Sequence, residues 1–530
     1  MDVDEIINKP SRHPYQCIAS VTKGVQSAPN VYLLAACGPR LHSDTGKDEP
    51  NGNDEGERPA KKQKTGSSAP SSPNIIKLTV SPDQQHAVAV TDDKVIHVFS
   101  VGLDGALQEL SERAMPKRPC AIQVLPDNAT IICGDKFGDV YSLSLLPKEP
   151  SETADATAGA RQPQSEQPQP TEQEKPAFKP SATNLTVHTK RNLKALQAQQ
   201  NQKNFSARKE PLKFEHSLLL GHVSMLTDAV FATRVVEGKE RGFIITADRD
   251  EHIRISRGPP QSHVIEGFCL GHKEFVSKLC VIPKTDLLVS GGGDEELFVW
   301  NWPEFKLLRK FDIAGAMFDA IRGAKDAGKS AVEAAENAKE LQPASEHGGK
   351  AISMHRINIS GLWTAPFANG KGHTETLVLV ASERMPALFA VPVNRLQLKK
   401  RTELTDCVLA HPPLDVVSIG NSVLVSLDCR SDDGGPLIHV YKLKQGPEAK
   451  GSILFDDDEE MMHKLSCLEK VQAEGKFDDK KLDDLLYGVA SLRKRKGEDV
   501  PRVPHGDDEA EEQAMGVEGY GQMPKGEADI

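Results

Sequence analysis

The sequence predicts an all-β fold built from small antiparallel sheets. Short runs of β-branched and other apolar residues recur along the chain, for example at residues 95–99, 140–145 and 297–300. Turns rich in glycine, aspartate and proline separate them, and short strands at this spacing are typical of a sandwich, a barrel or a propeller. The runs do not alternate with long helices, which argues against a parallel α/β sheet.

Two neighbouring segments repeat one pattern, and this self-similarity favours the propeller. Each begins with a Gly-His pair, and the two pairs lie 50 residues apart, near the period of about 40–45 residues of a WD-repeat blade. In such a blade a histidine, a hydroxyl residue, a turn aspartate and a tryptophan satisfy one another by hydrogen bonds. The pattern predicts a partial and a complete tetrad, formed by His222, Thr246 and Asp250 and by His272, Ser290, Asp294 and Trp300. In the first segment Ser256 stands where the tryptophan would be.

Counting such units predicts a seven-bladed WD-repeat β-propeller within residues 1–456. Two long insertions, about 44–73 and 147–210, lack the apolar residues that a folded core needs and are expected to be disordered. A third, about 314–341, is rich in alanine, glutamate and lysine and predicts a helix. Residues 457–496 carry apolar residues at helical spacing, and residues 497–530, with ten acidic and two basic side chains, predict a solvated tail.

Composition and motifs give no sign of an enzyme. The net charge is −11, and the nine cysteines are scattered without a CxxC pair, which predicts a reduced intracellular protein without disulfides or a metal site. The N-terminus does not resemble a signal peptide, and no apolar run is long enough to cross a membrane. Phosphate-loop, dinucleotide-binding, serine-hydrolase and zinc-protease motifs are absent. We interpret the glycines at 291–293 as a turn rather than a phosphate loop, and expect no catalytic residue, cofactor or metal.

Basic clusters offer local sites for a partner or for nuclear import. Lys61, Lys62 and Lys64 lie in a predicted disordered loop and resemble a nuclear localisation signal, although a solvated charge run has the same composition. Residues 493–496 are four consecutive basic residues, and residues 190–209 form a third basic segment with almost no aromatic residues for stacking on bases. The clusters predict a nuclear protein.

Residues 218–302 carry a more specific resemblance. They include LLLGHVSMLTDAVF, then ADRDEHIRIS, FCLGHKEFVS and LLVSGGGDEELFVWNW. This stretch closely resembles the WD-repeat subunit of the eukaryotic tRNA (guanine-N7) methyltransferase in its fungal form. The likeness extends more loosely to residues 33–36, 75–98 and 134–145, and it does not cover the long insertions or the acidic tail.

The resemblance implies a heterodimer with a separate catalytic subunit. That subunit would bind S-adenosylmethionine and methylate a guanine in the tRNA variable loop, while the propeller binds neither cofactor nor target base and stabilises the active conformation of its partner. The resemblance also places a partner-contacting basic residue at Arg254. Arg249, Lys273 and Lys278 are further candidates for this contact, and a solvated strand residue is an equally good interpretation of Arg254.

Three other functions remain open from the sequence. The chain could be a generic nuclear WD-repeat adaptor such as a ubiquitin-ligase receptor, although Trp300 is followed by Asn301 rather than the Asp-x-Arg ending of such receptors. It could be an RNA-processing scaffold that binds RNA through residues 190–209. An enzyme in its own right is the least favoured of the three, because no catalytic motif is present.

Overall fold

The computed structural model describes residues 13–24, 30–44, 72–147, 214–318, 357–368, 374–396, 404–430, 435–446, 453–468 and 479–494. The predicted insertions and the acidic tail lie wholly or largely outside these residues, as do the three lysines of the candidate localisation signal. One compact unit extends to Leu492, and the second unit, 493–530, is described only at its first two residues.

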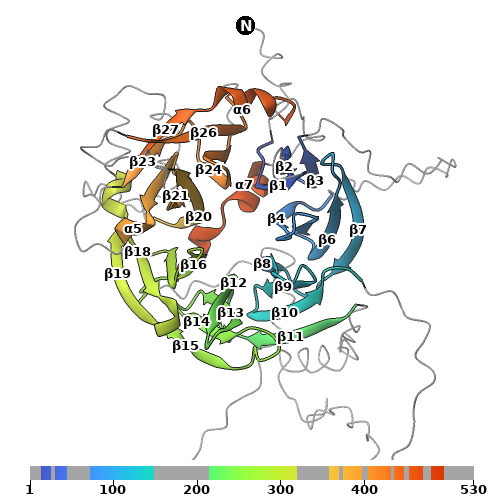
Figure 1. The fold of residues 1–530 in the computed structure, drawn as a ribbon, viewed down its shortest axis with the longest axis vertical. Coiled ribbons are helices and arrows are strands. Elements are labelled where there is room, and N and C mark those ends of the chain that lie inside the picture. The colour runs from blue at the N-terminus through green and yellow to red at the C-terminus, as the bar shows by residue number, and fades with distance from the viewer. Residues whose placement is uncertain are drawn as a thin grey trace, which may run out of the picture. The chain divides into compact units, whose positions relative to one another are not determined.

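Seven antiparallel sheets are arranged as blades around a common axis (Figure 1). The first blade has three strands and each of the others has four. Blade by blade, the strands are β1 (Cys17–Lys23), β2 (Asn30–Cys37) and β3 (Arg40–Ser43); β4 (Ile75–Val80), β5 (His86–Thr91), β6 (Val95–Val101) and β7 (Leu107–Ala114); β8 (Pro119–Val124), β9 (Thr130–Asp135), β10 (Asp139–Ser144) and β11 (His216–Gly221); β12 (Leu226–Val236), β13 (Lys239–Asp248), β14 (Ile253–Arg257) and β15 (Ile265–Cys269); β16 (Val276–Val281), β17 (Leu287–Gly292), β18 (Glu296–Asn301) and β19 (Lys306–Asp312); β20 (Ile359–Ala368), β21 (Thr374–Ser382), β22 (Ala387–Pro392) and β23 (Thr405–Val408); β24 (Pro413–Ile419), β25 (Ser422–Leu427), β26 (Ile438–Gln445) and β27 (Ile453–Asp457). The predicted seven-bladed propeller is confirmed.

The first strand of each blade lies on the inside of the ring. β1, β4, β8, β12, β16, β20 and β24 contact one another in this order, and the ring closes where β1 lies beside β24. Each sheet consists of consecutive strands, so the blades at the two ends of the propeller do not exchange a strand. Residues 405–408 form β23, the outer strand of the sixth blade, and pair with β22.

Apolar residues from neighbouring blades pack face to face, which fixes one blade against the next. Between the fourth and fifth blades, Ile253 and Ile255 of β14 belong to one buried cluster with Phe298 and Trp300 of β18. All four side chains are almost completely removed from solvent. The alternation of side chains along a strand places such residues on one sheet face, where each blade buries apolar surface against the next.

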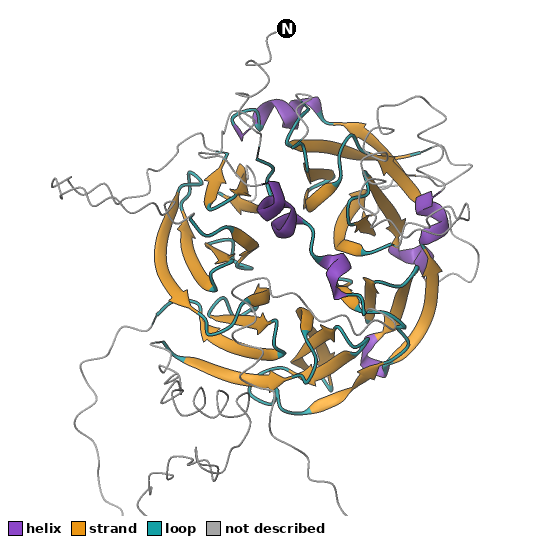
Figure 2. Cartoon of the chain, turned by 180° about the vertical axis from the view of Figure 1, so that it is seen from behind, coloured by secondary structure: helices purple, strands orange, loops and turns teal. Residues whose placement is uncertain are grey.

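Short helices follow the last blade. α6 (Glu459–Lys464) begins after Asp458, whose side chain accepts a hydrogen bond from the Met461 amide. α7 (Asp479–Leu486) lies across the middle of the ring in both views (Figures 1 and 2) and is followed by the 3₁₀ helix η3 (Val489–Leu492). Two more short helices, η1 (Trp302–Glu304) and α5 (Val393–Leu396), connect strands within blades.

Side-chain contacts attach α7 and η3 to three blades. Asp483 pairs with Arg384 of the sixth blade and with Arg430 of the seventh. Glu383 accepts hydrogen bonds from two backbone amides of η3, at 2.8 Å each. At the far end, Arg249 Nε of the fourth blade donates to the Leu492 carbonyl at 2.9 Å. Residues 479–492 therefore form a strap over one end of the propeller.

All nine cysteines are free thiols in this structure. Among the helices in the described residues, none is long and apolar enough to span a membrane.

Candidate partner interface on the fourth blade

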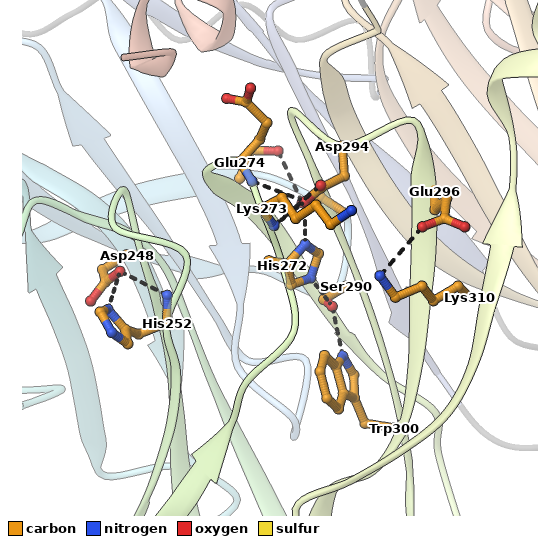
Figure 3. A network of polar contacts seen from close by, with 12 residues as sticks. Asp248, His252, His272, Lys273, Glu274, Ser290, Asp294, Glu296, Trp300 and Lys310 are labelled. Atoms are coloured by element: carbon orange, nitrogen blue, oxygen red, sulfur yellow. Dashed lines mark hydrogen bonds and ion pairs between the residues drawn. The ribbon is translucent and has the colours of Figure 1, made fainter. Parts of the chain in front are cut away.

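The fifth blade contains a closed network of four polar side chains (Figure 3). His272 Nε2 lies 2.7 Å from Ser290 Oγ, and His272 Nδ1 lies 2.8 Å from Asp294 Oδ2. Trp300 Nε1 donates to Ser290 Oγ at 2.8 Å. The four residues that the sequence grouped therefore lie together in the structure, and each is buried.

The network defines the protonation of His272. Because the indole donates to the Ser290 hydroxyl, that hydroxyl is free to donate to His272 Nε2, and His272 Nδ1 donates to the Asp294 carboxylate. These hydrogen bonds are all satisfied by a neutral imidazole with its proton on Nδ1. Burial lowers the pKa of His272, although the hydrogen bond with Asp294 acts in the opposite direction. The histidine is thus a structural residue and not a catalytic base.

The fourth blade has a similar but incomplete network, and its aspartate is not the predicted one. His222 Nε2 lies 2.8 Å from Thr246 Oγ1, and His222 Nδ1 lies 3.4 Å from Asp248 Oδ2. The prediction of Asp250 is wrong for this contact. Asp248 is the buried carboxylate. Its Oδ1 also accepts hydrogen bonds from the backbone amides of Asp250 and His252, and these bonds stabilise the turn.

Arg254 takes the place that an aromatic ring occupies in the next blade. Thr246 pairs with Arg254 in the same register in which Ser290 pairs with Phe298. Phe298 stacks on His272 with ring centroids 3.8 Å apart. Arg254 instead donates from Nη1 to the Gly221 carbonyl at 2.9 Å.

The expectation that Arg254 presents its charge to a partner is not met in this structure. The residue is only 7% exposed, and its Nε is buried without a hydrogen-bond partner. The strand position explains the difference, because this register directs the side chain toward Gly221 and not outward. Ser256, at the position of Trp300, is also completely buried and its hydroxyl has no partner.

Several exposed apolar side chains lie on the chain segments next to this incomplete network. Val223 is fully exposed, Met225 is 36% exposed, and Phe268 and Leu270 are 42% and 61% exposed. Two contacts bring their segments together, since the Arg249 amide donates to the Met225 carbonyl and Phe268 is the strand partner of Arg254. We call Val223, Met225, Arg249, Phe268 and Leu270 the blade-four surface. An exposed group of large apolar residues with a basic side chain beside it is typical of a protein-binding site.

The two lysine candidates lie in different environments. Lys273 is exposed on the loop before β16, and its amide is fixed by the Asp294 carboxylate. Lys278 instead lies on the innermost strand β16, where the charge of Lys77 of β4, with burial as a second cause, lowers its pKa to about 8. The structure therefore separates Lys278 from Arg249 and Lys273. Asp248 and the loop at Lys273 and Glu274 can be followed in Figure 3.

The chemistry of this region is that of a binding surface. Within the described residues, no group of three or more histidine, cysteine, aspartate or glutamate side chains is arranged to hold a metal ion. Gly291 and Gly292 belong to β17, and a Cβ at Gly292 would lie 1.8 Å from the Phe275 carbonyl oxygen. These glycines allow two strands to approach closely and do not form a phosphate loop.

Comparison with known proteins identifies the family. The model of the tRNA methyltransferase TRM82 WD40 domain matches residues 38–439. The chain belongs to this family. A TRM82 relative from Phaeosphaeria nodorum is 36% identical over 521 residues, which cover 91% of this chain and 99% of the relative. The resemblance expected from residues 218–302 is confirmed and extends over most of the chain.

Further TRM82 relatives agree in length and name. One from Coccidioides immitis is 38% identical and covers 80% of this chain and 78% of its own, and one from Aspergillus fumigatus is 33% identical and covers 92% and 99%. Each is named tRNA (guanine-N(7)-)-methyltransferase non-catalytic subunit.

Sequence reasoning missed the apolar part of the blade-four surface. Val223, Met225, Phe268 and Leu270 are apolar and resemble core positions in composition. The pattern of polar and apolar residues at the end of β15 is the only signal that could have indicated it, because Phe268 and Leu270 flank the buried Cys269.

Proposed function

We propose that this chain is the non-catalytic subunit of a tRNA (guanine-N7) methyltransferase. It binds a separate catalytic subunit, which holds S-adenosylmethionine and transfers the methyl group, and it contributes no catalytic residue and no cofactor. The names of relatives that match over nearly the whole chain carry this proposal. The family to which the chain belongs supports it further.

The blade-four surface is the proposed contact with the catalytic subunit. It combines partly or fully exposed apolar side chains with the basic Arg249, whose Nε donates to the Leu492 carbonyl, and such a combination suits an interface with an apolar centre and a charged edge. Lys273 lies on the neighbouring loop and is assigned to the edge. Arg254 is buried and contributes by holding the Gly221 backbone through its hydrogen bond to the Gly221 carbonyl.

Binding at this surface would favour the active conformation of the catalytic subunit. A partner that binds one of two conformations more tightly shifts the population toward it, by no more than the difference in binding free energy. The propeller suits this role because its blades are fixed to one another by buried apolar clusters. tRNA is then reached through the complex, and the proposed location is the nucleus, with Lys61, Lys62 and Lys64 as the import signal.

A co-purification experiment with the affinity-tagged full chain tests this proposal. The wild-type chain should retain a methyltransferase subunit at a one-to-one ratio. The double variant Val223→Asp/Leu270→Asp should lose it, because two carboxylates would have to be desolvated in the apolar part of the interface. Leu103→Asp is the matched control, since Leu103 is 79% exposed on the second blade.

Two outcomes of this experiment would contradict different parts of the proposal. Retention of the partner by the double variant would exclude the blade-four surface while leaving the subunit assignment intact. Failure of the wild-type chain to retain any methyltransferase would contradict the assignment itself. Arg254→Glu is a poor test, because it would place a carboxylate against the Gly221 carbonyl and near Asp248 and so disturb the blade.

A further inference from the structure

The strap, residues 479–492, is held on the propeller mainly by polar contacts (Figure 2). Among the side chains of residues 480–492, only Leu482 is buried. Asp483 forms ion pairs with Arg384 and with Arg430, so one carboxylate attaches α7 to two blades. A segment that buries so little apolar surface depends on such contacts to remain in place.

A tyrosine and the start of η3 extend this attachment toward the fourth blade. The Tyr487 hydroxyl donates a hydrogen bond to the Asp428 carboxylate, and the Arg384 guanidinium lies 4.2 Å from the centroid of the Tyr487 ring. Glu383 accepts the first two backbone amides of η3. These contacts fix the direction in which η3 leaves α7.

The C-terminal end of η3 meets the blade-four surface at Arg249. Arg249 Nε donates to the Leu492 carbonyl at 2.9 Å, and the Arg249 amide donates to the Met225 carbonyl at 2.9 Å. A basic side chain suits this position, because the last carbonyls of a helix have no partner within the helix. The two amino groups of the guanidinium form no hydrogen bond or ion pair within the described residues. The strap therefore holds Arg249 at Nε and leaves both amino groups available.

The strap borders the blade-four surface and does not cover it. With the strap in place, Val223 is fully exposed and Leu270 is 61% exposed. Arg249 itself is half-buried. This arrangement is that of an element that orients a side chain at the edge of a surface, and it differs from that of a lid.

We infer that the strap is a positioning element for the contact with the catalytic subunit, and that it fixes Arg249 so that its two amino groups bind a carboxylate of that subunit. This inference rests on the proposed function of the blade-four surface. The two amino groups of a planar guanidinium can pair with both oxygens of one carboxylate. A mobile arginine loses side-chain entropy when it binds, whereas a side chain that is already fixed loses less. Ordering one such side chain in advance should tighten binding by about 3- to 10-fold.

Hydrogen exchange of the unbound full chain tests whether the polar contacts hold the strap. The variant Asp483→Asn/Tyr487→Phe removes both ion pairs of the strap and its hydrogen bond to Asp428. The backbone amides of residues 487–492 should then exchange about 10-fold faster or more, while exchange in the blades stays unchanged. Glu383→Gln weakens the attachment from the propeller side and is an independent second variant.

Affinity measurements test whether the strap acts through Arg249. The methyltransferase subunit that co-purifies with the wild-type chain is immobilised, and Kd is measured for each full-length variant. Asp483→Asn/Tyr487→Phe should weaken binding by about 3- to 10-fold, and Arg249→Met should weaken it at least as much. When all three substitutions are combined, the loss should equal that of Arg249→Met alone, because residues that act through one contact are not additive.

Asp456→Asn is the matched control. It removes the ion pair between Asp456 and Lys444 on the two outer strands of the seventh blade, β26 and β27. Within the described residues, neither side chain forms a polar contact with the strap. The control should change neither the exchange of residues 487–492 nor the Kd.

Three outcomes would overturn the inference and leave the proposed function intact. The first is faster exchange of the strap with an unchanged Kd. The second is an additive loss in the triple variant, which would show that the strap contacts the partner independently of Arg249. The third is unchanged exchange in both Asp483→Asn/Tyr487→Phe and Glu383→Gln, because these contacts would then not hold the strap. Failure of the wild-type chain to bind any methyltransferase subunit would instead contradict the proposed function and this inference with it.

Discussion

The fourth and fifth blades share one strand register but differ in how their polar residues are satisfied. In the fifth blade His272, Ser290, Asp294 and Trp300 form a closed network, and Phe298 stacks on the histidine. The fourth blade has an arginine and a serine at the two aromatic positions, and Arg254 Nε and Ser256 Oγ lack a partner there. The fifth blade also has two buried polar atoms without a partner, Asn301 Oδ1 and Trp302 Nε1, but these lie outside its network. The fourth blade carries the exposed apolar side chains of the blade-four surface.

This comparison indicates a division of roles between adjacent blades. A closed network of buried hydrogen bonds stabilises one unique arrangement, whereas buried polar atoms without partners lower stability. The two blades pack against each other through Ile253 and Ile255 of the fourth and Phe298 and Trp300 of the fifth. The fourth blade carries the residues of the proposed partner contact.

Removal of Trp300 should produce the largest effect. The side chain is completely buried and stacks on Phe298, and Trp300→Ala would leave a cavity and remove one of the two hydrogen bonds of the Ser290 hydroxyl. We expect a loss of about 3–5 kcal/mol in the free energy of unfolding. Urea unfolding measures it, and a loss as small as that of a surface substitution would contradict the closed network of the fifth blade.

Substitution of Asp248 should lower the free energy of unfolding less than Trp300→Ala does, but more than substitution of Asp250. Asp248→Asn weakens the contact with His222 and the acceptor for two turn amides, so we expect a loss of about 1–3 kcal/mol. Asp250→Asn changes a half-buried turn residue and should cost less than about 0.5 kcal/mol. The two variants are compared by urea unfolding, and the opposite order would restore Asp250 to the network.

Acidification should weaken the fifth blade through His272. Its pKa is lowered in the folded chain, so the unfolded chain binds a proton first as the pH falls through about 6.5. Stability is therefore lost as the pH decreases from 7.5 to 5.5. The urea midpoint of the wild-type chain should fall more steeply over this range than that of His272→Gln. Equal slopes for the two chains would show that His272 titrates normally.

Ser256→Ala should have the smallest effect. The hydroxyl is buried without a partner, so its removal leaves no acceptor unsatisfied and should change the free energy of unfolding by less than about 0.5 kcal/mol, or raise it slightly. A thermal-unfolding comparison with the wild type is sufficient. A large loss would mean that Ser256 makes a contact equivalent to that of Trp300.

The sequence was informative where a local pattern determines the structure. The spacing of His272, Ser290, Asp294 and Trp300 was sufficient to place the fifth blade, because a complete tetrad has only one consistent arrangement. In the fourth blade the same spacing selected Asp250, but the turn folds so that Asp248 faces His222. A difference of two residues within a turn depends on backbone geometry and not on composition.

The sequence also did not predict which charged residues are buried. Arg254 was expected to be a contact residue because a core does not need a charge, yet its guanidinium reaches a backbone carbonyl that only the fold brings near. Lys278 was likewise expected to belong with Lys273, but it lies on β16, the innermost strand of the fifth blade. A long basic side chain can be either exposed or buried, because its aliphatic part packs like an apolar residue.

Reconstitution of methyl transfer tests the central claim most directly. The catalytic subunit is assayed for S-adenosylmethionine-dependent methylation of tRNA alone, with the wild-type chain, and with Val223→Asp/Leu270→Asp. We predict that the chain alone transfers no methyl groups, that the wild-type pair forms N7-methylguanosine, and that the double variant restores little activity. Full activity of the catalytic subunit without the chain, or methyl transfer by the chain alone, would contradict the account.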